Sequence, residues 1–123
     1  MASNKKSAID FLNMVIAGRI DEAYQKYVDM NGKHHNPYFP KGFKELQKGM
    51  EDNHRQFPLK KFSIKNVLED GNLVAVHSHL MFKEGEDGII TFHMFRFDKG
   101  KIVEMWDCGQ PIQRNSPNKD GPF

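Results

Sequence analysis

The sequence has little that would support cross-linking, charge-driven binding to nucleic acid or insertion into a membrane. Cys108 is the only cysteine, which excludes an internal disulfide and a cysteine-built zinc site. The formal net charge is only +2, and the densest basic cluster, Lys60, Lys61 and Lys65, is too sparse to form a nucleic-acid-binding face. No segment approaches the roughly 20 apolar residues of a membrane span. We therefore expect a cytoplasmic protein without nucleic-acid or membrane partners.

The composition is that of one ordinary folded domain. The chain has 123 residues, of which 38% are hydrophobic and 28% charged, and most domains are close to this size. Apolar residues recur at helical spacing in three segments, which predicts three helices: 4–17, a short one from residue 21, and 41–56. We expect one domain over residues 1–113, followed by a poorly ordered tail over residues 114–123.

The second half of the chain has the alternating pattern of strands. The period of two begins at residue 61, and turn residues divide the pattern into four predicted strands, which start at 61 and then run over 73–82, 89–98 and 101–108. Residues 31–40 contain two prolines, which penalise a helix and predict a loop with room for a short strand. Helices followed by an antiparallel meander predict an α+β fold, in which a curved sheet wraps the helices and leaves a cone-shaped cavity.

Alternation along the last two strands predicts which side chains line that cavity. A histidine and an aspartate lie within an apolar set that shares one face of these strands: His93, Phe95, Phe97, Val103, Met105 and Asp107. A few polar groups in an apolar wall are typical of a small-molecule pocket. The opposite face carries Arg96, Glu104 and Trp106, an ion pair beside an indole, and fits a partly solvated surface or a subunit interface.

The strand over residues 73–82 leaves two alternatives open. His77 and His79 share one of its faces, but both faces are largely apolar, so alternation does not say which one lines the cavity. Two histidines at this spacing can chelate a metal ion, and they can equally be half-exposed residues of a sheet.

Two segments of the chain resemble SnoaL-like proteins of the nuclear transport factor 2-like superfamily. They are HHNPYFPKG at residues 34–42 and HMFRFDKGKIVEMWD at residues 93–107. The first contains the family's His-Asn-Pro as His35, Asn36 and Pro37. The second matches its Phe-Arg strand and its Gly-Lys-Ile-x-Glu-x-Trp-Asp strand, and the resemblance extends from the first helices to Gln110.

The resemblance implies a cone-shaped α+β barrel with a pocket for a small hydrophobic molecule and a homodimer formed through the sheet. Polyketide cyclases of this family use an Asp and a His for acid–base chemistry on a carbon acid. This chain has His93 at the position of that Asp, and Met105 at the position of that His. Family members include cyclases, isomerases, hydrolases and ligand binders, so the family does not determine the reaction.

We therefore expect acid–base chemistry on a carbonyl compound, with no cofactor and no metal. The candidate catalytic residues are His93, Asp107 and His35. The candidate ligand-binding residues are Asn36, Tyr38, His77, Phe95 and Met105. Two alternatives remain, a binding module that holds a ligand without turnover and a dimerisation scaffold whose cavity is filled by Phe and Met side chains.

Overall fold

The structure, a computed structural model, describes residues 3–123 and contains three helices and five strands. The helices are α1 (Asn4–Ile16), α2 (Ile20–Tyr27) and α3 (Phe43–Gln56). The strands are β1 (Val28–His34), β2 (Lys61–Asp70), β3 (Leu73–Met81), β4 (Ile89–Asp98) and β5 (Lys101–Pro111). Side-chain capping begins α1, because the Ser3 hydroxyl accepts a hydrogen bond from the backbone N–H of Lys6.

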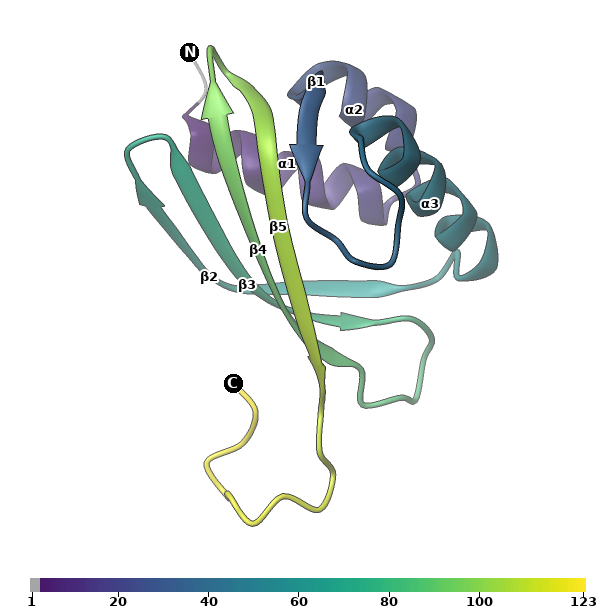
Figure 1. Cartoon of the computed structure of the whole chain (residues 1–123). Coiled ribbons are helices and arrows are strands. Elements are labelled where there is room, and N and C mark those ends of the chain that lie inside the picture. The colour runs from purple at the N-terminus through teal and green to yellow at the C-terminus, as the bar shows by residue number, and fades with distance from the viewer. Residues whose placement is uncertain (1–2) are drawn as a thin grey trace.

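The strands form one open sheet in the order β1-β5-β4-β3-β2. All neighbouring strands are antiparallel except β1, which pairs with β5 in parallel. The sheet is strongly curved, and β2 and β3 bend around one end of the helical layer (Figure 1). The α+β class and the cone-like arrangement predicted from the sequence are confirmed, although the sheet is not closed into a barrel.

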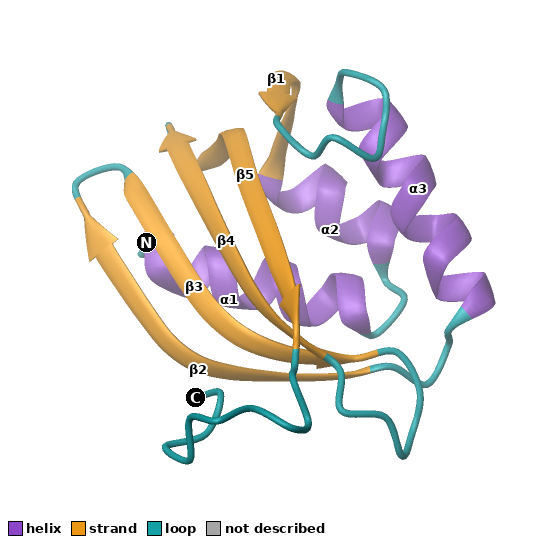
Figure 2. Cartoon of the chain, turned by 60° about the horizontal axis from the view of Figure 1, so that its bottom comes forward, coloured by secondary structure: helices purple, strands orange, loops and turns teal. Residues whose placement is uncertain are grey.

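The helices cover the concave face of the sheet (Figure 2). The core lies between the two layers, where the Phe11 ring of α1 packs edge-on against Phe95 of β4 at a centroid distance of 5.9 Å. Tyr24 of α2 lies beside Phe11 and also contacts Phe43 of α3. Val74 and Val76 of β3 are fully buried under the same helices. Burial of this apolar layer is the main contribution that holds the cone together.

A β-bulge in β5 changes which residues face the core. Arg96 pairs with Glu104, but Phe97 pairs with Ile102, so Val103 has no partner on β4. Ile102 is fully buried and Val103 only partly. The prediction that Val103 lines the inner face was wrong, because strict alternation does not hold across an extra residue.

Strand β1 runs very close to this bulge. A Cβ atom at Gly32 would lie 2.3 Å from the backbone oxygen of Val103, so no larger residue fits without moving the backbone. The first part of the segment predicted as a loop over residues 31–40 belongs to strand β1, which ends at His34. The pairing of β1 with β5 leaves the following loop, residues 35–42, beside the middle of β5, where the His35 N–H donates to the backbone oxygen of Met105.

The C-terminal segment, which we expected to be poorly ordered, lies across the convex face of the sheet in this structure. Phe123 packs against His77 and His79 of β3, with centroid distances of 5.7 and 4.9 Å. Arg114 forms an ion pair with Asp87 in the β3–β4 connection.

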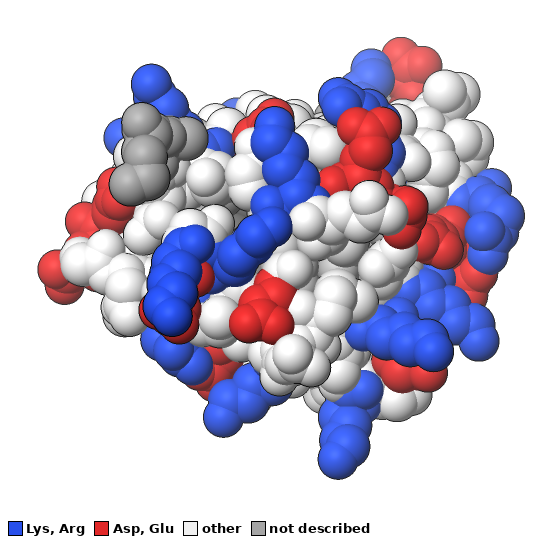
Figure 3. Space-filling model, turned by 90° about the horizontal axis from the view of Figure 1, so that it is seen from above, with Lys and Arg blue, Asp and Glu red and all other residues white. Residues whose placement is uncertain are grey.

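Charges of both signs are mixed on the face seen in Figure 3, where Lys and Arg side chains lie among Asp and Glu side chains. None of the helices formed by residues 3–123 is long and apolar enough to cross a membrane.

Candidate functional site

The central feature of the inner face is a histidine–aspartate pair. His93 on β4 lies directly opposite Asp107 on β5 in the antiparallel register, and residues in such positions are close enough for their side chains to interact. The Nδ1 atom of His93 is buried and has no hydrogen-bond partner among the described residues. Such an atom is rare in folded proteins, and it marks a place where a bound group or strain is expected.

Two opposing effects set the protonation of His93. Burial lowers the pKa of its imidazole below the ordinary value of 6.5, and the negative charge of Asp107 offsets part of that lowering. His93 is therefore neutral at pH 7 and can accept a proton. Asp107 lies in position to stabilise the imidazolium that would result.

The loop after β1 holds Asp107 in place. The side-chain amide of Asn36 donates a hydrogen bond to Oδ2 of Asp107 at 3.1 Å. The Asn36 backbone N–H donates to Nδ1 of His34, whose Nε2 lies 2.8 Å from the carbonyl oxygen of Pro40. These contacts assign the proton of His34 to Nε2. They also tie His34 to the start of the loop at Asn36 and to its far side at Pro40. Asn36 thus acts on the aspartate as a positioning residue.

Tyr24 of α2 is a further polar group near the pair. Its side chain is 2% exposed, and burial raises the pKa of its hydroxyl, with the charges of Asp107 and Glu51 raising it further. The hydroxyl therefore remains protonated at neutral pH and can donate a hydrogen bond. From the sequence, Tyr24 is a candidate helper of the acid–base chemistry together with Tyr27 and Tyr38, although its spacing is also that of a core residue.

Ser78 and Thr91 form a polar contact that the sequence analysis did not single out. Their hydroxyls hydrogen-bond to each other across β3 and β4, on the inner face next to the row of His93. Both residues are almost completely buried. In the sequence, Ser78 alternates in line with Val74 and Val76, and Thr91 in line with Phe95, which is the pattern of two hydroxyl residues on a buried face.

His35 lies on the other side of the sheet from His93 and Asp107. Its Nε2 is 2.6 Å from a carboxylate oxygen of Glu104, and its ring stacks on Trp106 at 5.3 Å. Arg96 donates two hydrogen bonds to the second carboxylate oxygen of Glu104. The hydrogen bond from His35, followed by those from Arg96, lowers the pKa of Glu104. The predicted ion pair of Arg96 and Glu104 is thus present, and the ring that stacks on the indole of Trp106 is that of His35.

The remaining candidate residues divide between the core, the convex face and solvent. Phe95 and Met105 are buried beneath the pair, so a ligand could touch them only if the packing changed. His77 lies on the convex face, stacked on Phe92 at 4.6 Å and hydrogen-bonded to Asn66. Tyr38 is 87% exposed. Of the candidate ligand-binding residues, Asn36 is the one that hydrogen-bonds to the pair, and the Phe95 ring stacks on His93.

Burial along β3 answers the question that alternation left open. Val74, Val76 and Ser78 are fully buried and face the helices, which places His77 and His79 on the convex face. The Nε2 atom of His79 lies 2.7 Å from the backbone oxygen of Asp87. Among residues 3–123, no group of three or more His, Cys, Asp or Glu side chains is arranged to hold a metal ion.

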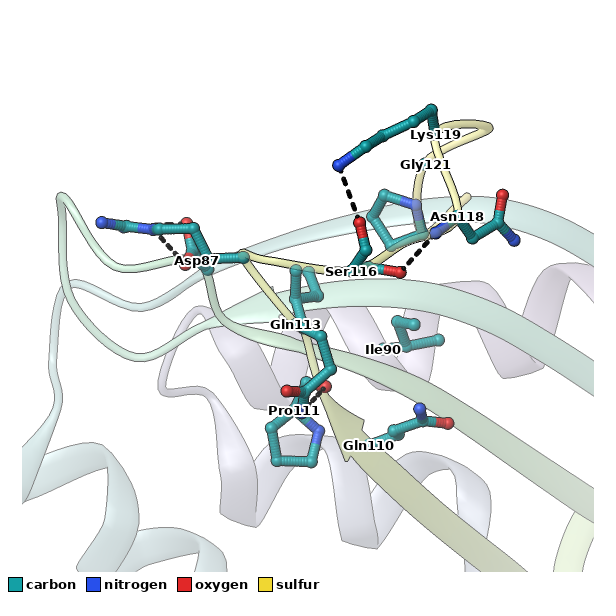
Figure 4. A pocket seen from close by; sticks show the side chains of 12 residues that line it. Asp87, Ile90, Gln110, Pro111, Gln113, Ser116, Asn118, Lys119 and Gly121 are labelled. Atoms are coloured by element: carbon teal, nitrogen blue, oxygen red, sulfur yellow. Dashed lines mark hydrogen bonds and ion pairs between the residues drawn. The ribbon is translucent and has the colours of Figure 1, made fainter.

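A separate hollow lies between the convex face and the C-terminal segment (Figure 4). Its volume is about 470 Å³, and its wall includes Ile90 and Gln110 from the sheet and Ser116 and Lys119 from the segment. It is open to solvent and lies on the opposite side of the sheet from His93. It is therefore unrelated to the chemistry of the inner pair.

Comparison with known families and structures gives one family match and many similar folds. The family model described as SnoaL-like domain matches residues 8–105. A search of curated proteins finds no significant match.

Several solved structures share the fold at low sequence identity. An NTF2-like protein of unknown function from Burkholderia xenovorans is 17% identical, with a TM-score of 0.74, covering 93% of this chain and 88% of its own. A proposed isomerase of the SnoaL-like family from Agrobacterium tumefaciens is 13% identical, with a TM-score of 0.72 and coverages of 89% and 99%. IdmH from Streptomyces antibioticus, a proposed polyketide cyclase, is 15% identical, with a TM-score of 0.70 and coverages of 89% and 93%. At these identities the likeness shows the fold alone.

Proposed function

Since this chain belongs to the SnoaL-like domain family, we propose that it binds a small hydrophobic carbonyl compound inside the cone and moves a proton at the carbon beside the carbonyl group. The observation that carries the proposal is the buried Nδ1 of His93, which has no partner among the described residues and lies on the strand opposite Asp107. A histidine whose only role was structural would be expected to have that nitrogen hydrogen-bonded.

The chemistry follows from the protonation states of the three polar groups. Neutral His93 accepts a proton from the carbon, which leaves an enolate on the substrate and an imidazolium beside Asp107. The carboxylate favours the imidazolium, and Asn36 keeps the carboxylate in position. Tyr24, which stays protonated, supplies a donor for the developing enolate oxygen. Return of the proton to a different atom gives isomerisation, and attack of the enolate on a second carbonyl gives cyclisation.

We expect the protein to catalyse exchange of hydrogen for deuterium at the carbon beside the carbonyl of hydrophobic ketones and ketoesters in D₂O. Asp107→Asn keeps the size of the side chain but removes the charge that supports the imidazolium, so exchange should slow by about a hundredfold, within the range of a positioned acid–base group. Proton NMR measures the rate. Asp98→Asn, a change at an exposed aspartate at the end of β4, serves as the control.

If none of a broad panel of carbonyl compounds exchanged faster than in buffer, the proton-transfer proposal would be wrong. A ligand that binds in the cone without exchange would favour the non-catalytic alternative. That alternative is supported by the replacement of the family's Asp and His by His93 and Met105.

We also propose that the protein forms a homodimer through the convex face of the sheet. This face carries exposed apolar side chains, Phe92 at 49% and Leu68 at 72% exposure. We expect a native mass spectrum to give twice the subunit mass of 14.3 kDa. Leu68→Glu should shift the spectrum towards the monomer, whereas a monomeric wild type at micromolar concentration would refute the proposal.

A further inference from the structure

Lys60 is a buried cation without an anionic partner. Lys60 and Glu104 are each 9% exposed, the two residues with ordinarily charged side chains that are buried within the described chain. Glu104 forms ion pairs with Lys33, His35 and Arg96. Lys60 forms none with the residues of 3–123, and its ammonium lies 3.5 Å from Nδ1 of His54. An unpaired buried charge is costly, and it is a property expected of a site that binds an opposite charge.

The side chain of Lys60 points towards the helical layer. It precedes β2 directly and contacts His54 near the C-terminal end of α3. The ring of His54 in turn lies against Gly18, where a Cβ atom would meet Nε2 at 2.3 Å. Lys60 is therefore enclosed where the α1–α2 turn, the end of α3 and the start of β2 meet, which is one end of the cone.

The other charged groups near this end are already paired. Arg55 of α3 forms an ion pair with Asp52, and the neighbouring Lys61 pairs with Glu84. Burial lowers the pKa of Lys60, as expected for an ammonium without a carboxylate beside it. Among the described residues, Lys60 therefore has no carboxylate of its own, and a negatively charged ligand could supply one.

Two rows of the inner face lie between Lys60 and the His93–Asp107 pair. In the row nearer Lys60, the strands β2, β3 and β4 present Phe62, Leu80 and Ile89 side by side. These three side chains are only partly buried, in contrast to the fully buried Phe95 beyond the pair. The row nearer the pair contains Ile64 and the hydrogen-bonded hydroxyls of Ser78 and Thr91. Val67, which is in register with His93 through Val76, lies seven residues after Lys60, and one of these is the extra residue of the bulge at Lys65, so the distance along β2 is about 20 Å.

We propose that the ligand of the cone is an amphipathic carbonyl compound that carries a carboxylate, and that this carboxylate pairs with Lys60. The apolar part of the ligand lies along Phe62, Leu80 and Ile89, and its carbonyl end reaches the His93–Asp107 pair. This inference rests on the proposed function, since it assigns a substrate class to the same cone.

The test compares decanoate with decanol by isothermal titration calorimetry at pH 7, using wild type, Lys60→Met and Lys61→Met. Lys61→Met is the matched control, because Lys61 is adjacent and exposed and pairs with Glu84. We expect decanoate to bind wild type and Lys61→Met equally, and Lys60→Met at least tenfold more weakly, about the effect of one hydrogen bond to a charged group. Decanol should bind all three proteins alike, and Lys60→Arg should keep most of the affinity for decanoate.

Equal binding of decanoate by wild type and folded Lys60→Met would overturn the inference, and so would an absence of decanoate binding to wild type. Circular dichroism verifies that the variants are folded. Failure of the acid–base proposal is distinguished by the deuterium-exchange assay, in which Asp107→Asn is the informative variant. Lys60-dependent binding of decanoate without exchange of any carbonyl compound would retain the carboxylate site and remove the proton transfer.

Discussion

Replacing His93 with leucine is expected to stabilise the protein while abolishing proton transfer. The buried Nδ1 of His93 has no partner, and an unsatisfied buried polar atom costs about 1–3 kcal/mol. Leucine has a similar volume, makes the apolar contacts of the ring and has no polar atom to leave unsatisfied. We expect the free energy of unfolding at pH 7 to rise by about 1 kcal/mol, and deuterium exchange to fall to the rate in buffer.

The difference between wild type and His93→Leu should also depend on pH. Because the pKa of His93 is lowered in the folded protein, the unfolded chain takes up this proton first as the pH falls below 6.5. Wild type therefore loses stability through His93 from about pH 6.5 downwards, until the pH reaches the lowered pKa of the folded state. The variant lacks this loss, so its advantage should grow over that interval.

Urea denaturation between pH 5 and 8 measures this difference. Thr91→Val on the same strand is the matched control, because it removes a polar atom that does have a partner and leaves the Ser78 hydroxyl unsatisfied. The control should lower stability by about 1–3 kcal/mol. A variant His93→Leu that was destabilised to the same extent would mean that His93 has a structural partner, and the acid–base role would lose its main support.

Phe95→Ala is expected to have the largest effect on stability. The ring is fully buried and contacts the rings of Phe11, His93 and Phe97. Truncation of a buried phenylalanine removes its apolar contacts and leaves a cavity, which costs about 3–5 kcal/mol. That is a large part of the total stability of a small domain. Urea denaturation at pH 7 measures the loss.

Phe92→Ala on the same strand provides the comparison for Phe95. Phe92 faces the convex side, is 49% exposed and stacks on His77, so its truncation should cost only about 1 kcal/mol. The sequence analysis assigned Phe95 to the ligand-binding wall. Suppose that Phe95→Ala lost no more stability than Phe92→Ala but bound ligand more weakly. Phe95 would then belong to the ligand-binding wall and not to the core.

Alternation predicted the inner face well where the strand is regular. The expected strand over residues 89–98 has the bounds of β4, and its alternation places His93 and Phe95 inside as predicted. Alternation does not predict the position of Val103, because Ile102 and Val103 are both apolar and nothing in their sequence indicates the bulge. It could not decide the face of β3 either, since valines alternate there with histidines, alanine and leucine.

The place of His35 could not be derived from local pattern. Its partner Glu104 is 69 residues away in the chain, and the contact depends on the parallel pairing of β1 with β5. That pairing in turn depends on Gly32, which allows close approach to Val103. Lys60 was noted only for its place in a basic cluster, because burial of a cation is a property of the tertiary structure.

The loop after β1 joins the two sides of the sheet through a single peptide bond. His35 contacts Glu104 on the convex face, and the next residue, Asn36, holds Asp107 on the concave face. A displacement of His35 would therefore also displace Asn36, and with it the hydrogen bond to Asp107, because the two residues are adjacent in the chain. A substitution at the surface around Trp106 is therefore expected to change the position of the Asp107 carboxylate, although Trp106 alternates with Asp107 and lies on the convex face.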